Sequence, residues 1–365
     1  MNIGNAAASS VEAGAVTLNG GSQVTIGDLT AHNAVVVDNA GTLLQLLGDY
    51  SQSAGDFRLS GAATFDVNGT FNKTGAGEFH LFGGSTFDIG VPAASSIEAG
   101  AVTVRTGYTV SIGELTAHDN VDITENGTLV HVLGDYMQDG GFFAINFGGD
   151  FDVDGTFIKT GTGGFFLVGG GSFEIGNPAA SSVEAGAVTV RTGYTVSIGE
   201  LTAHDNVDIT ENGTLVHVLG DYMQDGGFFA INFGGDFDVD GTFIKTGTGG
   251  FFLVGGGSFE IGNPAASSIE AGDTHIDTGT VTLGDFIARG NFDVNNPGVL
   301  VHLLGDYQQT NGQFHVFQNA TVRVDGTFTK TGTGPFIIDS GGSLVLTNPA
   351  ASSIEAGDTH IDTGT

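Results

Sequence analysis

The chain has 365 residues, no cysteine, and 41 acidic against nine basic side chains, which gives a net charge of −32. Disulfides and thiolate metal sites are therefore excluded, and nucleic-acid binding is not expected because a polyanion repels phosphates. The 63 glycines lack the collagen period, and 28 phenylalanines provide enough apolar surface for a core. No apolar run is long enough for a membrane-spanning helix, and the N-terminal residues show no signal peptide.

A repeat of 86 residues organises the chain. The repeats cover 4–89, 90–175, 176–261 and 262–346, followed by a partial repeat at 347–365. Residues 98–182 are identical to 184–268, and the tail 348–365 is identical to 263–280. We therefore expect one continuous domain over 1–365. Because the chain begins and ends inside the repeat, we expect either a piece of a longer array or a subunit that continues end to end.

Each repeat divides into four segments of 21 to 23 residues, and most segments open with glycine. Apolar and polar residues alternate within 134–154, which is typical of a half-buried strand. The apolar positions are Phe147, Phe151 and Val153, and the polar positions are Asp150, Asp152 and Asp154. Glycine pairs and Thr-Gly or Asn-Gly steps interrupt this pattern at short intervals. We expect three short strands in each segment, separated by glycine-rich corners.

The third position of successive segments favours coiled stacking over a hairpin meander, which Asn126-Gly127 would otherwise suggest. In the four segments that begin at Gly113, Gly134, Gly155 and Gly176, this position holds Leu115, Tyr136, Phe157 and Pro178. One turn per segment would stack like residues about 4.8 Å apart and pair the backbone of each turn with the next. We therefore predict an all-β protein that forms a single right-handed parallel β-solenoid. It has 21–23 residues per turn and four turns per repeat. Proline cannot donate a ladder hydrogen bond, so it should lie at a corner or strand start beside a small bulged loop.

The segments GDYSQSAGDF from Gly48, GDYMQDGGFF from Gly134 and GDYQQTNGQF from Gly305 resemble the rungs of repeat-rich bacterial surface β-helices. The similar families are the autotransporter passengers and the filamentous-haemagglutinin-like adhesins and matrix fibres. The resemblance covers the whole chain and implies an exported, extracellular rod that adheres to something or spaces something. It assigns no site residues. The chain departs from these families in its uniform repeats and in showing no secretion domain.

Two groups of acidic residues are candidates for calcium. Asp150, Asp152 and Asp154 precede Gly155 in the order of a calcium loop, although the twelfth position is not glutamate. Asp236, Asp238 and Asp240 form the same group one repeat later. On a strand, all six would project outward, where the alternative is a solvated acidic surface.

Stacked acidic pairs form the second group. Glu114 lies one segment before Asp135, and Glu200 lies one segment before Asp221. Like charges on neighbouring turns repel, and either bound calcium or salt would relieve the repulsion. No cofactor other than calcium is expected.

Histidines such as His118, His131 and His204 recur once per repeat, so their copies lie about four turns apart and cannot share one metal. His118 and His131 share a segment, but a site with two histidines would lack further ligands. We therefore expect ordinary surface histidines.

The sequence predicts a mechanical function and no enzymatic activity. Polysaccharide-active β-helix enzymes are a remote alternative, but they need one unique pair of acids, and every acid here recurs. We expect an extracellular structural rod, roughly 80 Å long at about 4.8 Å per turn, that assembles head to tail with copies of itself. The alternative is the stalk of a giant surface adhesin that binds glycans or a cell surface. Phe142–Phe143 and Phe165–Phe166 are adjacent pairs, so one member of each should face outward and could bind glycans or associate laterally.

Overall fold

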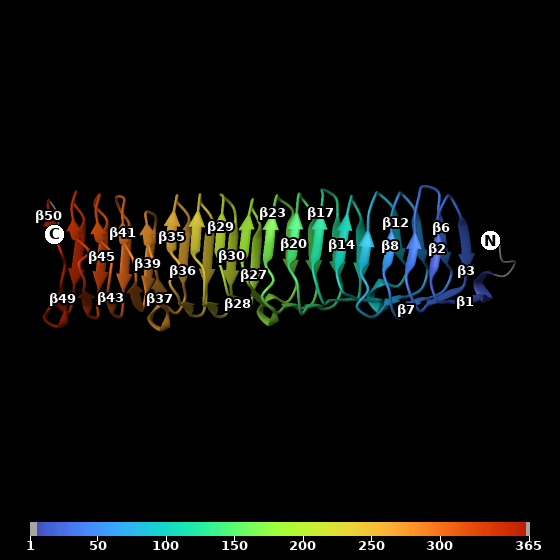
Figure 1. The fold of residues 1–365 in the computed structure, drawn as a ribbon, viewed down its shortest axis with the longest axis horizontal. Coiled ribbons are helices and arrows are strands. Elements are labelled where there is room, and N and C mark those ends of the chain that lie inside the picture. The colour runs from blue at the N-terminus through green and yellow to red at the C-terminus, as the bar shows by residue number, and fades with distance from the viewer. Residues whose placement is uncertain (1–5, 363–365) are drawn as a thin grey trace. The chain divides into compact units, whose positions relative to one another are not determined.

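The structure, a computed structural model, describes residues 6–362 and divides into two compact units, Met1–Val183 and Glu184–Thr365. Within each unit, short strands stack in parallel as a β-solenoid, one turn per sequence segment (Figure 1). The predicted all-β solenoid is therefore confirmed, and the hairpin alternative is wrong because the paired strands run parallel.

Each turn contributes one strand to each of three faces, as the glycine-rich corners predict. The turn that begins at Gly134 contains β19 (Tyr136–Gln138), β20 (Phe143–Asn146) and β21 (Asp150–Val153). Each strand pairs without a shift with its counterpart one turn later, so that Tyr136 lies beside Phe157. Partly buried and fully buried residues alternate along β21, because successive side chains point to opposite sides.

The first unit contains the strands from β1 to β24, drawn from blue to green in Figure 1. Its first face consists of β1 (Ser10–Ala13), β4 (Asp28–Ala31), β7 (Tyr50–Gln52), β10 (Phe71–Lys73), β13 (Ser96–Ala99), β16 (Glu114–Ala117), β19 and β22 (Phe157–Lys159). Its second face consists of β2 (Val16–Leu18), β5 (Val35–Val37), β8 (Phe57–Leu59), β11 (Phe79–Leu81), β14 (Val102–Arg105), β17 (Val121–Thr124), β20 and β23 (Phe165–Val168). Its third face consists of β3 (Gln23–Ile26), β6 (Leu43–Leu46), β9 (Thr64–Val67), β12 (Thr86–Ile89), β15 (Thr109–Ile112), β18 (Leu129–Val132), β21 and β24 (Ser172–Ile175). The boundary between the units falls within β25 (Ser182–Ala185).

The second unit has the same three faces. Its first face consists of β28 (Glu200–Ala203), β31 (Tyr222–Gln224), β34 (Phe243–Lys245), β37 (Ser268–Ala271), β40 (Asp285–Ala288), β43 (Tyr307–Gln309), β46 (Phe328–Lys330) and β49 (Ser353–Ile354). Its second face consists of β26 (Val188–Arg191), β29 (Val207–Thr210), β32 (Phe229–Asn232), β35 (Phe251–Val254), β38 (Thr274–Ile276), β41 (Phe292–Val294), β44 (Phe314–Val316), β47 (Phe336–Ile338) and β50 (Thr359–Ile361). Its third face consists of β27 (Thr195–Ile198), β30 (Leu215–Val218), β33 (Asp236–Val239), β36 (Ser258–Ile261), β39 (Thr280–Leu283), β42 (Leu300–Leu303), β45 (Thr321–Val324) and β48 (Ser343–Leu346).

Proline lies at a corner as predicted, but it does not join the stack of third-position residues. Pro178 begins the 3-10 helix η3 (Pro178–Ala180), and the residue beside Phe157 is Ser181, whose hydroxyl accepts the Phe157 N–H at 2.9 Å. The same loop recurs as η1 (Ala6–Ala8), η2 (Pro92–Ala94), η4 (Pro264–Ala266) and η5 (Pro349–Ala351). It interrupts the third face, where β12 and β15 belong to separate sheets. A proline could not supply a ladder N–H, so the extra residues carry it out of the ladder.

The core of each unit is a set of aromatic stacks. Tyr136 and Phe157 are stacked with ring centres 4.6 Å apart, and Phe143 and Phe165 are stacked at 5.5 Å. Phe151 meets Phe143 edge to face at 5.1 Å, so rings from the three faces interlock inside each turn. Stacked and edge-to-face rings are each favourable beyond the burial of their apolar area.

The alternation predicted within 134–154 fails at Phe147, which is 71% exposed and has a positive φ of 51°. Phe147 follows β20 and occupies a corner rather than an inward strand position. The corner forces a left-handed backbone there, and this turns the ring away from the core.

Candidate functional site

The corner between the first and second faces points backbone carbonyls inward, and a buried glutamine satisfies them. The Gln138 side-chain amide donates to the carbonyls of Gly140 at 2.7 Å and Phe142 at 3.0 Å. Its Oε1 atom accepts the Tyr136 hydroxyl at 2.9 Å. Gln138 is fully buried, so this network lets a tight glycine corner form without unsatisfied polar groups.

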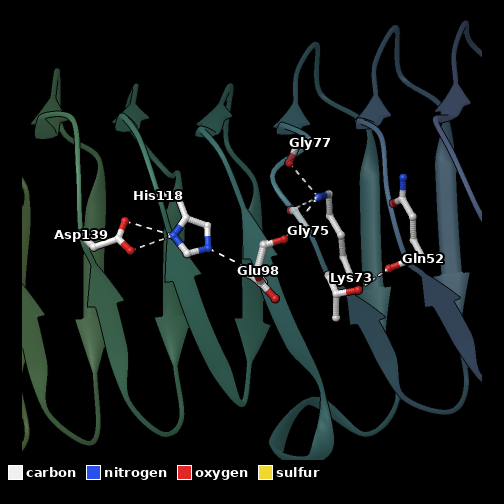
Figure 2. Close-up of polar contacts among 8 residues, drawn as sticks. Gln52, Lys73, Gly75, Gly77, Glu98, His118 and Asp139 are labelled. Carbon is white, nitrogen blue, oxygen red and sulfur yellow. Dashed lines mark hydrogen bonds and ion pairs between the residues drawn. The ribbon is translucent and has the colours of Figure 1, made fainter.

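One turn after each of these glutamines, a buried lysine satisfies the corner carbonyls instead. Lys73 lies beside Gln52 in the ladder and has no exposed surface. Figure 2 shows its ammonium reaching the corner, where Nζ donates to the carbonyls of Gly77 at 2.7 Å and Gly75 at 3.4 Å. Burial lowers the pKa of Lys73 to about 8, although the charges of Asp56 and Glu98 raise it. Sequence reasoning missed this lysine, which recurs fully buried as Lys159, Lys245 and Lys330.

A histidine bridges two carboxylates on the outside of the first face. His118 Nδ1 lies 2.9 Å from Asp139 Oδ2, and His118 Nε2 lies 3.2 Å from Glu98 Oε1 (Figure 2). These hydrogen bonds, first to Asp139 and then to Glu98, raise the pKa of His118. Both ring nitrogens can donate only in the imidazolium form, so the site favours a cation.

The second unit repeats this bridge and then replaces it. His204 lies between Asp225 at 2.9 Å and Glu184 at 3.1 Å, and its pKa is raised by the same contacts. In the fourth repeat the position belongs to Arg289, whose Nε donates to Glu270 at 2.9 Å. The outer surface therefore holds a cation here, whether from histidine or arginine.

A candidate metal centre lies on the third face of the first unit. His131 Nε2 is 3.0 Å from Asp154 Oδ1 and 3.5 Å from Asp152 Oδ2. One ligand atom from each of the three side chains lies within 4.8 Å of the others, the only such group of three within residues 6–362. His131 comes from β18, whereas Asp152 and Asp154 come from β21 and the residue after it, so the group joins two successive turns.

The same residues recur in the second unit. His217 Nε2 is 3.0 Å from Asp240 Oδ1, and Asp238, Asp240 and Glu260 line one surface pocket with His217. Burial, followed by the charge of Glu260, raises the pKa of Asp238. Its Oδ1 atom is shielded from solvent and has no hydrogen-bond partner within the part of the chain that the structure describes.

The predicted calcium groups are only partly brought together. Asp150 and Asp236 point outward from their strands as predicted, but each is engaged with the next turn. Asp150 Oδ1 accepts the Ser172 N–H at 2.7 Å and the Ser172 hydroxyl at 2.8 Å, and Asp236 accepts the same pair from Ser258. The convergent group therefore contains the second and third aspartates with a histidine, not the three aspartates. Calcium binding stays a prediction.

In each stacked acidic pair, the aspartate accepts a hydrogen bond from a backbone N–H of the next turn. Asp135 Oδ1 accepts the N–H and the hydroxyl of Thr156, both at 2.8 Å, and these bonds lower the pKa of Asp135. Asp221 has the same bonds to Thr242 and the same shift. Neither Glu114 with Asp135 nor Glu200 with Asp221 gathers a third ligating side chain within residues 6–362. Threonine donors thus stabilise the charge that calcium was expected to neutralise.

The sequence did contain the signal for the His131 group. Asp152 lies 21 residues after His131, which is one turn, and Asp154 lies two residues further on. Copies of one histidine lie 86 residues apart, so the prediction that they cannot share a metal holds. The contact of His131 with the aspartates of the next turn was not predicted, because only residues of like type were compared at the spacing of one turn.

One phenylalanine of each adjacent pair faces outward as predicted, but neither outward ring is strongly exposed. Phe142 and Phe166 do face outward, but both are half-buried, as are Phe228 and Phe252. The Phe166 ring covers Gly164, where an added Cβ would collide with it. The strongly exposed aromatic side chains are instead Phe147 and Phe233, at 71% and 70%.

Comparisons with known proteins gave no match to a family model, to a curated protein or to a solved structure. Within residues 6–362, no helix has the length and apolar character needed to cross a membrane.

Proposed function

We propose that the protein is a structural element, an extracellular rod whose solenoid units carry load or hold other components apart. The observation that carries this proposal is the unshifted parallel pairing of strands in successive turns within each unit, interrupted only on the third face at the proline loops, around repeated aromatic stacks. Backbone ladders and stacked rings resist bending and leave few internal polar groups unpaired.

The distribution of chemically active side chains also supports a mechanical role. The His–carboxylate bridge, the buried lysine and the contact of a third-face histidine with an aspartate each recur in both units. Catalysis usually depends on one unique constellation, whereas repeated groups are expected in a protein whose turns all perform the same task.

Self-assembly end to end is part of this proposal. In the second unit, β37 and β38 pair with β40 and β41 of the next turn. The sequences of β49 and β50 match residues 268–269 and 274–276 of β37 and β38, so they offer the same pairing chemistry to a turn from another copy. Contacts between unlike surfaces of identical subunits generate open filaments.

Electron microscopy of the purified protein tests the proposal, first with calcium and then with a chelator. We expect filaments many times longer than one chain. Loss of the filaments after chelation would assign calcium a role in assembly. Compact particles with no elongated axis would contradict the rod, and isolated rods under both conditions would contradict self-assembly.

A second candidate function is that of an adhesin stalk that binds glycans, and the exposed aromatics favour it. Phe147 and Phe233 project from corners at 71% and 70% exposure, and sugar rings stack on exposed aromatic faces. A glycan array probed with the native protein and with the Phe147→Ala/Phe233→Ala variant tests this function. The control is Phe142→Ala/Phe228→Ala, which alters half-buried rings. Binding that only the first variant abolishes supports an adhesin, and an array without any bound glycan counts against one.

A further inference from the structure

One outward column of the third face changes its chemistry between repeats. The second repeat has Ser111, His131, Asp152 and Glu174, and the third has Ser197, His217, Asp238 and Glu260. The fourth repeat has Thr282, His302, Arg323 and Val345, and the first has Thr25, Gln45, Asp66 and Asp88. We call these positions the third-face column. Within this column, a histidine followed one turn later by aspartate occurs only in the second and third repeats.

In the second repeat the column and a neighbouring aspartate form a compact set of ligands, and in the third repeat the same residue types line one surface pocket. His131 Nε2 lies 3.5 Å from Asp152 Oδ2 and 3.0 Å from Asp154 Oδ1. A tetrahedral ion with bonds of about 2.0–2.2 Å holds neighbouring ligand atoms about 3.3–3.6 Å apart. The separation from Asp152 falls within this range and the separation from Asp154 is slightly shorter, so small side-chain rotations would complete the geometry.

The ligand types point to a transition metal instead of calcium. Calcium takes six to eight oxygen ligands, whereas an imidazole nitrogen with carboxylates suits zinc, cobalt, nickel or copper. We propose that His131, Asp152 and Asp154 bind one divalent transition-metal ion such as Zn²⁺. We propose that His217, Asp238 and Asp240 bind a second. Glu174 and Glu260, next in the column, or a water molecule would supply the remaining ligand.

An unpartnered oxygen in the second copy supports this assignment. Asp238 Oδ1 is shielded from solvent without a hydrogen-bond partner in the described residues, although His217, Asp240 and Glu260 line the same pocket. A buried carboxylate oxygen without a donor is unfavourable, and crowding by further carboxylates makes it more so. A divalent cation in this pocket would coordinate the oxygen and neutralise the surrounding charge.

In the fourth repeat, the third-face column has an arginine at the position of the proposed aspartate ligand. There, Arg323 occupies the position of Asp152, and its Nε donates to Asp325 at 2.9 Å. His302 Nε2 contacts the other carboxylate oxygen of Asp325 at 2.8 Å. Arginine thus places a fixed positive charge beside the carboxylate, where the second and third repeats have room for an ion. The fourth repeat is a built-in control that should not bind metal.

Because each proposed site takes its histidine from one turn and its aspartates from the next, a bound ion would fasten successive turns together. This inference does not depend on whether the chain forms a rod or a filament. Metal binding and assembly can therefore be tested separately on the same protein.

The test is equilibrium binding of Zn²⁺ to the full chain, together with the visible absorption of the Co²⁺-loaded protein. We expect two strong sites per chain and an absorption spectrum typical of low-coordinate Co²⁺ with nitrogen and oxygen ligands. His131→Gln and His217→Gln should each remove one site, weakening binding there by at least the roughly 10–100-fold that loss of an outer-shell partner costs. Glutamine is a structurally compatible replacement, since Gln45 holds this position in the first repeat and donates to Asp66 at 3.0 Å.

The matched control is His302→Gln, which alters the column in the fourth repeat and should leave both sites unchanged. Circular dichroism confirms that each variant remains folded. The proposal is overturned if Zn²⁺ does not bind at micromolar concentration, if the three variants weaken binding equally, or if neither His131→Gln nor His217→Gln weakens it. Displacement of Zn²⁺ by a comparable concentration of Ca²⁺ would also overturn it and would restore the calcium assignment.

Discussion

The inside and the outside of the first face follow different rules. In two of its turns the inside has the same four residues in each repeat, namely Tyr136 and Gln138 followed one turn later by Phe157 and Lys159 in the second repeat. The outside of the same strands varies, with Met137 and Ile158 in the second repeat but Gln308 and Thr329 in the fourth. Inward residues must stack on their neighbours and satisfy the corner carbonyls, whereas outward residues meet mainly water.

Charge provides a second, looser constraint on the outside. The position of His118 holds His204 in the third repeat and Arg289 in the fourth, and each has a glutamate one turn earlier. The side chain changes but the ion pair remains. The third-face column goes further, because the change from Asp152 to Arg323 reverses its sign. Packing and the corner carbonyls therefore fix residue identity at these four inward positions, whereas on the outside, at the position of His118, charge is kept while the side chain changes.

The largest effect should come from breaking an inward stack. Phe157→Ala removes a fully buried ring that stacks on Tyr136 at 4.6 Å. Large-to-small changes at buried phenylalanines cost about 3–5 kcal/mol. We expect a loss of this size in the free energy of unfolding, measured by urea denaturation. The control Ile158→Ala changes the next, outward residue and should cost much less; equal losses would contradict the contrast between inside and outside.

The buried lysines should produce a pH-dependent effect. Burial lowers the pKa of Lys73 to about 8 from 10.5, so above pH 8 the folded state binds fewer protons than the unfolded state. The free energy of unfolding should therefore rise as the pH increases from about 8 to 10. Lys73→Met should reduce this slope by up to about 1.4 kcal/mol per pH unit. Arg58→Met, which removes an exposed cation, should leave the slope unchanged.

A smaller loss of stability should follow when the Ser181 hydroxyl is removed, because this hydroxyl takes the place of a ladder carbonyl. Ser181→Ala leaves the buried N–H of Phe157 without its acceptor at 2.9 Å. An unsatisfied buried donor costs about 1–3 kcal/mol. We expect this decrease in the free energy of unfolding from urea titration, whereas Ser182→Ala, at the next and outward position, should be nearly neutral. A neutral Ser181→Ala would show that the proline loop can relax to supply another acceptor.

The sequence was sufficient to predict the solenoid because stacking imposes a constant segment length. Leu115, Tyr136 and Phe157 recur at the same position of successive segments, and the structure stacks them as predicted. Pro178 shares that position in the sequence but not in the ladder. Only the extra residues of its segment indicated a loop, and the Ser181 hydroxyl that replaces the missing backbone partner could not be inferred from spacing.

The candidate site was less predictable because it depends on side-chain directions at the corners. The alternation of β21 correctly placed Asp150 and Asp152 on the outside. It could not show that Ser172 would engage Asp150 while His131 turned toward Asp154. Phe147 fails for a related reason, since a positive φ at a corner reverses the direction that alternation assigns.

The smallest effect on stability should come from the His–carboxylate bridge on the outer surface. Its cation is histidine in one repeat and arginine in another. Contacts with Asp139 and Glu98 raise the pKa of His118 above that of an unfolded histidine, about 6.5. Stability from the bridge is therefore fully present below pH about 6.5 and is lost as the pH rises through the folded-state pKa.

Because His118 is 36% exposed, we expect this loss to be below about 1 kcal/mol. His118→Arg adopts the residue found at Arg289 and should retain the ion pair on both sides of the transition, whereas His118→Gln should lack it throughout. Urea midpoints at pH about 6 and about 8 give the comparison, because subtracting each variant from the native protein cancels the other titrating groups. If the native protein and His118→Arg respond equally to pH, then the bridge contributes no stability. The cation at this position would then serve only to reduce the excess negative charge of the surface.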